Sequence, residues 1–136
     1  MKKKFHFKVY KNDTGSLIPF SLKKDIPFSV KRIFIISGKK NAERADHAHY
    51  KCSQYLVAIK GSIEVKYEDK KGQYKKKLTF NNRQGLLLKP KTWCNVRFIN
   101  KDSILIVFCD REYEYFDYIE KYQKFLKIIN KKKWIY

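Results

Sequence analysis

Short apolar segments separated by turn residues run through the first 110 residues, and this spacing constrains the fold more than any other feature. Phe5, Phe7 and Val9 alternate with polar neighbours, and this period of two predicts a half-buried strand. Further strands are predicted at residues 32–37, 55–59, 63–67, 86–89 and 104–108, with turns at 12–16 and 69–72. Strands at this spacing without intervening helices predict a β-sandwich or a β-barrel.

After Asp110 the pattern changes to a helical one. Phe116, Ile119, Tyr122 and Leu126 recur every three or four residues, which predicts a helix over about 112–130 with one face in water. A chain of 136 residues is too short to divide into two parts that each bury a core. We therefore expect a single domain over residues 1–136, with a barrel at about 5–110 followed by the helix.

The formal net charge of +19 raises the question of a nucleic-acid or membrane partner. Only five of the 32 basic residues are arginine, and the lysines are scattered along the chain. A nucleic-acid footprint usually concentrates arginine and lysine on one element. A general preference for lysine accounts for the charge better, so we expect neither nucleic acid nor a membrane as a partner.

Cysteine usage and the N-terminal sequence bear on the compartment. Cys52, Cys94 and Cys109 are far apart and form no C-x-x-C pattern, which fits a reducing compartment better than a disulfide framework. The basic start lacks the apolar run of a signal peptide, and no stretch approaches the roughly 18 apolar residues of a membrane span. We expect a cytoplasmic protein.

The stretch at residues 43–54 carries the strongest chemical signal, the pair His47 and His49. Residues two apart on a strand share a face, so both imidazoles should project together. Imidazole titrates near neutrality and can accept and return protons. The purely structural alternative is a hydrogen-bonded pair at a barrel rim. Arg44, Lys51 and Gln54 lie close by, however, and such a polar cluster would be costly to bury without a function.

This stretch resembles the R-G-x-H-A-H-K-x-x-x-Q signature of the WxcM-like cupins, the nucleotide-linked sugar 3,4-ketoisomerases. Five further motifs are similar to those of the family and follow in the same order. They are G-S-L at 15–17, I-P-F-S-V-K-R at 26–32, G-S at 61–62, P-K-T-W at 90–93 and D-Y-I at 117–119. The resemblance extends from about residue 15 to residue 125.

The resemblance implies an all-β cupin, a double-stranded β-helix or jelly-roll barrel, with a C-terminal helix. It implies a cytoplasmic enzyme that moves the keto group of a dTDP-4-keto-6-deoxyhexose from carbon 4 to carbon 3. The product would serve the biosynthesis of 3-amino-3,6-dideoxy sugars for surface polysaccharide such as the O-antigen of lipopolysaccharide. It also implies that no metal or organic cofactor is used, and that the protein is a homodimer with exchanged N-terminal strands.

The residues themselves suggest the same absence of metal. Metal-binding cupins usually add a Glu shortly after H-x-H and a second His after the late Gly…Pro segment. Gln54 and Cys94 stand at these two positions, and His6, the only other histidine, alternates toward solvent. Two imidazoles with a neutral amide make a weak site for a divalent ion.

Roles for individual residues follow from the chemistry and the resemblance. His47 is our candidate for the base that moves the carbon-bound proton, and His49 for the acid and shuttle at the sugar oxygens. Arg32 and Arg44 are candidates for the diphosphate, because a guanidinium matches phosphate oxygens. The further candidate substrate-binding residues are Thr14, Phe34, Lys51, Gln54, Trp93, Cys94 and Arg97.

Three departures from the family leave alternatives open. Thr14 replaces an Arg or Tyr, Phe34 replaces a Tyr, and Cys94 replaces a His or Arg. The first alternative is therefore a non-catalytic sugar-nucleotide-binding cupin. The second, supported by charge alone, is a basic nucleic-acid-binding barrel. Gluco or galacto configuration of the product is left open.

Overall fold

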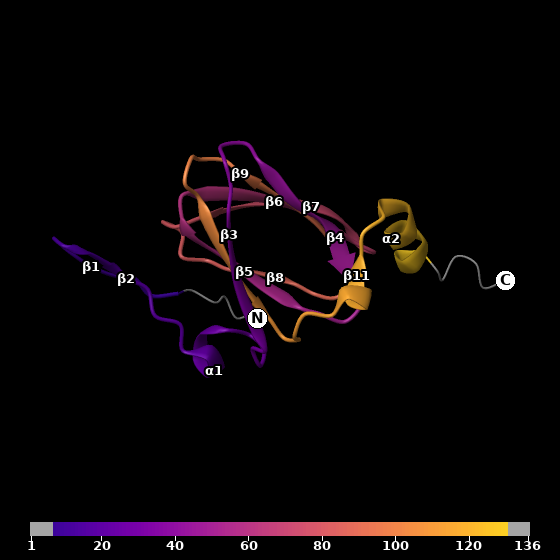
Figure 1. Ribbon diagram of the computed structural model, residues 1–136, viewed down its shortest axis with the longest axis horizontal. Coiled ribbons are helices and arrows are strands. Elements are labelled where there is room, and N and C mark those ends of the chain that lie inside the picture. The colour runs from indigo at the N-terminus through magenta and orange to yellow at the C-terminus, as the bar shows by residue number, and fades with distance from the viewer. Residues whose placement is uncertain (1–6, 131–136) are drawn as a thin grey trace.

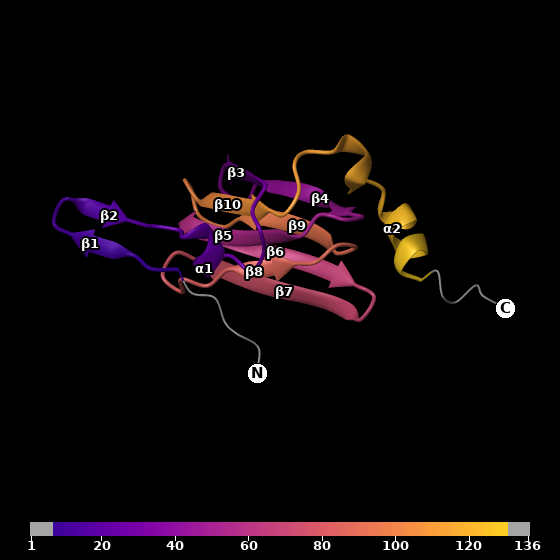
Figure 2. The same ribbon diagram turned by 90° about the horizontal axis from the view of Figure 1, so that it is seen from below.

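The computed structural model describes residues 7–130, in which two antiparallel sheets face each other (Figure 1). The first sheet contains, in spatial order, β3 (Arg32–Ser37), β10 (Ile104–Cys109), β5 (Gln54–Lys60) and β8 (Leu86–Leu88). The second contains β11 (Tyr118–Ile119), β4 (Glu43–His49), β9 (Trp93–Phe98), β6 (Ser62–Asp69) and β7 (Gly72–Thr79). A separate hairpin of β1 (Tyr10–Asn12) and β2 (Gly15–Leu17) projects away from both sheets (Figure 2). The predicted all-β jelly roll is confirmed.

The main hydrophobic core lies between the two sheets and follows the alternation of each strand. In β9 the side chains of Cys94, Val96 and Phe98 are buried, whereas those of the intervening residues are only partly buried on the outer face. Phe98 packs with Ile63 and Leu105 in the same core. The strand thus presents one face to the interior and the other to the outside, as a period of two requires.

The N-terminal segment covers the outer face of the four-stranded sheet. Phe7 and Ile26 pack on Tyr55, Val57 and Phe108, so β5 is buried on both faces. The strand predicted around Phe5–Val9 is not formed at residues 7–9, and residues 5 and 6 lie outside the described residues, as does His6. The alternation there serves side-chain packing, because Phe7 is 5% exposed. The short helix α1 (Leu22–Asp25) follows the hairpin and was not predicted.

The link between β5 and β6 explains the G-S motif. Gly61 has φ +73°, a left-handed conformation that favours glycine, and a Cβ there would collide with Ser103. The hydroxyl of Ser103 accepts a hydrogen bond from the backbone N–H of Ser62 at 3.2 Å. A larger residue at position 61 would therefore disturb the end of the barrel.

The C-terminal region differs from the helix predicted over 112–130. A 3₁₀ turn covers Tyr115–Asp117, then β11 pairs with β4, and the helix α2 begins only at Tyr122 and ends at Ile129. The apolar period was misleading at its start, because Phe116 is 90% exposed while Ile119 is buried beside Ala48 as part of the sheet. No helix within residues 7–130 is both long enough and apolar enough to cross a membrane.

Candidate active site

The two histidines lie at the end of β4, directly after an irregularity in its pairing with β9. Two residues of β4, Ala45 and Asp46, stand opposite one residue of β9, because Arg44 pairs with Val96 and His47 with Cys94. Ala45 has φ +83°, and this β-bulge changes the direction of the strand just before the pair. The two imidazole rings face each other edge to face with centroids 5.0 Å apart.

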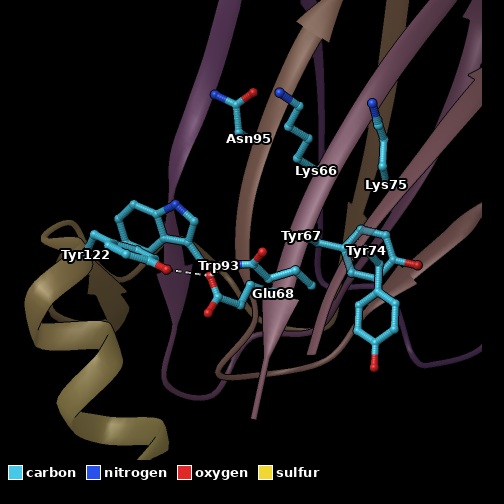
Figure 3. Close-up of a pocket in the computed structure, with 9 residues that line it drawn as sticks. Lys66, Tyr67, Glu68, Tyr74, Lys75, Trp93, Asn95 and Tyr122 are labelled. Atoms are coloured by element: carbon cyan, nitrogen blue, oxygen red, sulfur yellow. Dashed lines mark hydrogen bonds between the residues drawn. The ribbon is translucent and has the colours of Figure 1, made fainter. Parts of the chain in front are cut away.

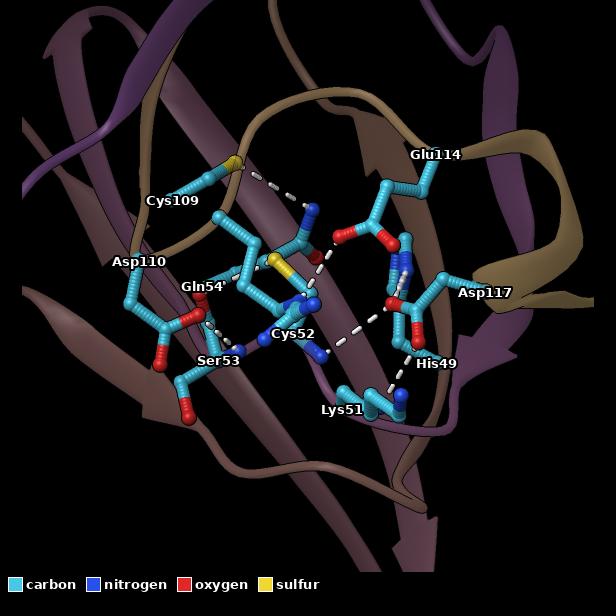
Figure 4. A network of polar contacts seen from close by, with 10 residues as sticks. His49, Lys51, Cys52, Ser53, Gln54, Cys109, Asp110, Glu114 and Asp117 are labelled. Atoms are coloured by element: carbon cyan, nitrogen blue, oxygen red, sulfur yellow. Dashed lines mark hydrogen bonds and ion pairs between the residues drawn. The ribbon is translucent and has the colours of Figure 1, made fainter.

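Asp117 fixes the deeper of the two rings. His49 is 7% exposed, and its Nδ1 lies 3.1 Å from Oδ2 of Asp117 (Figure 4). The same carboxylate accepts hydrogen bonds from the backbone N–H of Lys51 at 2.8 Å and of Cys52 at 3.1 Å. A carboxylate only accepts, so the proton of His49 resides on Nδ1 and its Nε2 carries a lone pair. Nε2 is buried and has no hydrogen-bond partner in the described part of the chain.

Aromatic side chains form a wall over the pair. Tyr118 pairs with His49 in the β11–β4 register, and its ring centroid lies 4.3 Å from that of His49 and 5.0 Å from that of His47. Tyr113 lies 5.7 Å from Tyr118. A cavity of about 370 Å³ opens here and has one of the two histidines in its lining. The lining comprises Asp46, His47, Tyr113, Tyr115, Tyr118 and Glu120.

Both imidazoles are neutral at pH 7. Burial, helped by the neighbouring His49, lowers the pKa of His47 from 6.5 to about 4. Burial also lowers the pKa of His49, although the hydrogen bond and the charge of Asp117 oppose this effect. Neutral imidazoles can take protons without first losing one, which a base at this site requires.

Arg32 brings positive charge to the same end of the barrel. Its guanidinium lies 4.7 Å from the ring centroid of Phe34 and 5.2 Å from that of Tyr113, and its charge contributes to the lowered pKa of His49. Phe34 packs against the main core and offers no hydroxyl at this point. Arg32 is thus close enough to His49 to influence it, and Phe34 packs on the Arg32 guanidinium; a role of either residue in substrate binding stays a prediction.

Below the histidines lies a buried cluster of Gln54, Cys52 and Cys109. The Nε2 of Gln54 lies 3.8 Å from the sulfur of Cys109. A hydrogen bond between the two thiols lowers the pKa of Cys109 and raises that of Cys52. Cys94 faces the same interior, and its burial raises its thiol pKa to about 12. It is therefore a neutral thiol beside His47.

Several predicted site residues lie away from His47 and His49 within the same chain. Thr14 sits in the turn of the β1–β2 hairpin, at the opposite end of the molecule from β11 (Figure 1). Arg44 and Lys51 are exposed, although the backbone N–H of Lys51 binds Asp117. Trp93 and Arg97 occupy the outer face of β9. Arg97 there binds Glu64 at 3.5 Å.

Two residues that contact the histidines, Asp117 and Tyr118, were not predicted as site residues. Their only signal was the D-Y-I motif, which was noted for its resemblance and given no role. No set of three or more His, Cys, Asp or Glu side chains within residues 7–130 is arranged to hold a metal ion. Independence from metal stays a prediction.

A jelly-roll barrel with neutral histidines beside an open cavity defines a cupin-like protein with a candidate acid–base site. Comparison with known proteins makes the assignment specific: the FdtA family model, described as WxcM-like, C-terminal, matches residues 2–130, and the chain belongs to this family. The resemblance inferred from the motifs is thereby confirmed.

The relatives agree in length and fold. The chain is 34% identical over 131 residues to the TDP-4-oxo-6-deoxy-α-D-glucose-3,4-oxoisomerase of Aneurinibacillus thermoaerophilus, covering 95% of this chain and 93% of the relative. A 3,4-ketoisomerase from Helicobacter canadensis is 30% identical with a TM-score of 0.82, covering 94% of this chain and 96% of that one. QdtA from Thermoanaerobacterium thermosaccharolyticum, a sugar 3,4-ketoisomerase solved with TDP, is 27% identical with a TM-score of 0.83, covering 98% and 96%.

Proposed function

We propose that this protein is a sugar-nucleotide 3,4-ketoisomerase that acts on a dTDP-linked 4-keto-6-deoxyhexose. The observation that carries the proposal is the pair of neutral imidazoles 5.0 Å apart, one of which lines an open cavity. Family membership and the activities named for the relatives support the same reaction. The conversion needs only proton transfers, which two histidines can supply without a cofactor.

His47 is proposed as the base for the carbon-bound protons, because it is the histidine in the cavity lining. It would take the proton from carbon 3, and the electron pair of that C–H bond would form the double bond of an enediolate between carbons 3 and 4. Oxygen 4 then gains a proton and oxygen 3 loses one, so that the negative charge of the enediolate moves from oxygen 4 to oxygen 3. Return of a proton to carbon 4 then leaves the ketone at carbon 3, so atoms and charge balance.

His49 is proposed as the shuttle between the two oxygens. Asp117 holds its proton on Nδ1, which leaves Nε2 able to accept a proton from a sugar hydroxyl and return it. Tyr118, whose ring lies 4.3 Å from that of His49, is proposed to relay protons to solvent. Its phenol would supply the hydroxyl that Phe34 lacks.

Five of the other candidate residues are proposed to bind the substrate, namely Arg32, Arg44, Lys51, Gln54 and Cys94. Arg32 is the best placed for the diphosphate, since its guanidinium lies beside Tyr113 at the mouth. Arg44 and Lys51 are exposed cations, Arg44 near the start of β4 and Lys51 just after its end beside His49. Gln54 and Cys94 would limit the depth of the sugar pocket, because both are buried and Cys94 pairs with His47.

Turnover of TDP-4-keto-6-deoxyglucose, followed by proton NMR, tests the proposal. We expect the wild-type protein to form the 3-keto product and the His47→Asn variant to form none while still binding TDP, because an amide cannot cycle a proton near neutral pH. An active His47→Asn variant would show that His47 is not the catalytic base. A wild-type protein whose melting temperature rises with TDP but which forms no product would be the non-catalytic binder.

We also propose a homodimer in which the β1–β2 hairpins are exchanged. All six hairpin residues are exposed, including Leu17 at 63%, and a two-stranded hairpin alone is only marginally stable in water. β3 is an edge strand and exposes Ile33 and Ile35 at 47% and 61%. An exchanged hairpin would cover this edge and carry Thr14 toward the partner.

Light scattering of the wild-type protein and of Leu17→Asp tests the dimer. A dimer that the substitution dissociates supports the exchange, whereas a monomeric wild-type protein contradicts it. A cytoplasmic location and a product used for amino-deoxy sugars of surface polysaccharide remain part of the proposal. All three cysteines are unpaired, which supports a reducing compartment.

A further inference from the structure

A second hollow, of about 580 Å³, lies on the outer face of the five-stranded sheet (Figure 3). Its floor is formed by β7, β6 and β9, and one wall is Tyr122, the first residue of α2. Trp93 belongs to this groove, whereas its neighbour Cys94 faces the opposite side of β9 and pairs with His47. Most of the groove lining is thus on the face of the sheet opposite the histidines, whereas Tyr67 and Tyr74, which complete the lining, share the register face of Cys94.

Strand register arranges the outer face in three rows that cross β7, β6 and β9. The row nearest α2 contains Gln73, Glu68 and Trp93, and the next contains Lys75, Lys66 and Asn95. The row farthest from α2 contains Lys77, Glu64 and Arg97. Successive rows are about 7 Å apart, since residues two apart on a strand share a face.

The first and third rows each contain one carboxylate. Glu68 accepts a hydrogen bond from the hydroxyl of Tyr122 at 2.6 Å and lies 3.4 Å from the amide nitrogen of Gln73. In the third row Glu64 lies 3.5 Å from Arg97. The first row therefore carries one net negative charge, and the third row, with Lys77 and Arg97 beside Glu64, carries one net positive charge.

The middle row is different, because Lys66 and Lys75 stand directly opposite each other without a carboxylate in the row. Neither lysine forms an ion pair with any of residues 7–130. Like charges directly opposite on neighbouring strands destabilise a sheet. Lysines on the edge strand β7 also discourage unwanted strand pairing, but that reason does not apply to Lys66, which lies on the inner strand β6.

An aromatic wall stands one row away from these two ammonium groups. The rings of Trp93 and Tyr122 meet edge to face with centroids 5.4 Å apart, and Phe125 supports both from behind. The hydrogen bond to Glu68 holds the Tyr122 ring in place. Such a wall presents apolar ring surface to the C–H groups of a sugar, while Asn95 beside it offers an amide oxygen.

We propose that this groove is a second ligand site, which binds the phosphate monoester of a sugar. The phosphate dianion would lie between Lys66 and Lys75, and the sugar ring would lie against Trp93 and Tyr122. A phosphate monoester carries close to two negative charges at pH 7 and so matches two ammonium groups better than a carboxylate does. Asn95 connects the groove to the histidine cavity, because its amide nitrogen donates a hydrogen bond to Asp46 at 2.9 Å. The two lysines lie outside the lining of that cavity, so the proposal is independent of the isomerase reaction.

Titration of the ¹⁵N-labelled full-length protein with glucose 1-phosphate, followed by NMR, tests the site. We expect shifts at the amides of Lys66 and Lys75 and at the indole of Trp93, with weaker binding of glucose and of inorganic phosphate alone. Lys75→Gln should weaken binding about tenfold, the effect expected from losing one of two nearby charges. Lys77→Gln removes the same charge on the same strand and face but should leave the affinity unchanged.

Absence of shifts at these residues would overturn the proposal, and so would equal weakening by both lysine variants, which would indicate diffuse attraction only. Inorganic phosphate that binds as tightly as glucose 1-phosphate would overturn the role of the rings. Tyr122→Phe should bind normally and Tyr122→Ala weakly, so that loss of the ring is separated from loss of the hydroxyl. Turnover by Lys75→Gln should equal the wild type, which keeps this test apart from that of the isomerase.

Discussion

Replacement of Asp117 by asparagine tests how the site holds His49. The carboxylate accepts three hydrogen bonds, from Nδ1 of His49 and from the backbone N–H groups of Lys51 and Cys52. The amide offers one oxygen and one NH₂ group. In either orientation of the amide, at least one buried N–H of these partners faces another donor. An unsatisfied buried donor costs about 1–3 kcal/mol, so we expect the melting temperature to fall by roughly 8 °C.

Turnover should fall more than this stability loss alone explains. If the NH₂ group faces His49, the ring must accept at Nδ1 and carry its proton on Nε2, which is then unable to accept a proton from the sugar. We expect kcat to fall about 10²–10⁴-fold, the range for an acid–base group, with TDP binding retained. The assay is proton NMR of TDP-4-keto-6-deoxyglucose below the melting temperature of the variant.

Asp110→Asn is the matched control for Asp117→Asn. Asp110 accepts a hydrogen bond from the backbone N–H of Ser53 at 2.8 Å and lies on the same side of the barrel, but it does not bind a histidine. This variant should lose some stability and keep its turnover. An Asp117→Asn variant with lower stability but wild-type kcat would show that the carboxylate only supports the loop at Lys51 and Cys52, and the shuttle role of His49 would be refuted.

Three further predictions concern pH, Phe34 and metal. The pKa of His47 is about 4 when folded and 6.5 when unfolded, so the unfolded state binds the proton first as the pH falls. We therefore expect the free energy of unfolding in urea to fall between pH 6.5 and pH 4 by about 3 kcal/mol more in the wild type than in His47→Asn. An equal fall in both proteins would contradict this. Phe34→Tyr should change kcat only within the 10²–10⁴-fold range of one acid–base group, because the wild-type protein is expected to be active without that hydroxyl; a silent wild type would contradict this. Activity should survive prolonged chelation, and elemental analysis that finds stoichiometric metal, with activity lost on its removal, would overturn that expectation.

The period of two in the sequence was enough to predict the barrel and the histidine pair. The same period wrongly predicted a strand at residues 7–9. The side chain of Phe7 is buried there by packing against the sheet, although its backbone is not part of a strand. Alternation along a strand places Trp93 and Cys94 on opposite faces of β9. The prediction that both residues bind the same substrate therefore overlooked this alternation. The β-bulge at Ala45 has no such signal in the sequence.

The contacts of Asp117 and Tyr118 could not be predicted from local pattern. Asp117 lies 68 residues from His49 along the chain, and the two meet only because β11 pairs with the end of β4. The apolar spacing around Phe116 and Ile119 favoured a helix, and the pairing of two residues with a sheet edge overrode it. Only the family motif marked this segment.

Deuterium uptake from heavy water tests the central claim most directly. The proton that His47 takes from carbon 3 exchanges with solvent while the enediolate exists. Deuterium should therefore return to carbon 3 of the substrate or to carbon 4 of the product. We predict that NMR in heavy water will show deuterium at carbon 3 of the recovered TDP-4-keto-6-deoxyglucose or at carbon 4 of the 3-keto product with the wild-type protein, and none with His47→Asn. Complete absence of uptake across several dTDP-4-keto sugars would contradict the enzyme and leave a protein that only binds sugar nucleotides.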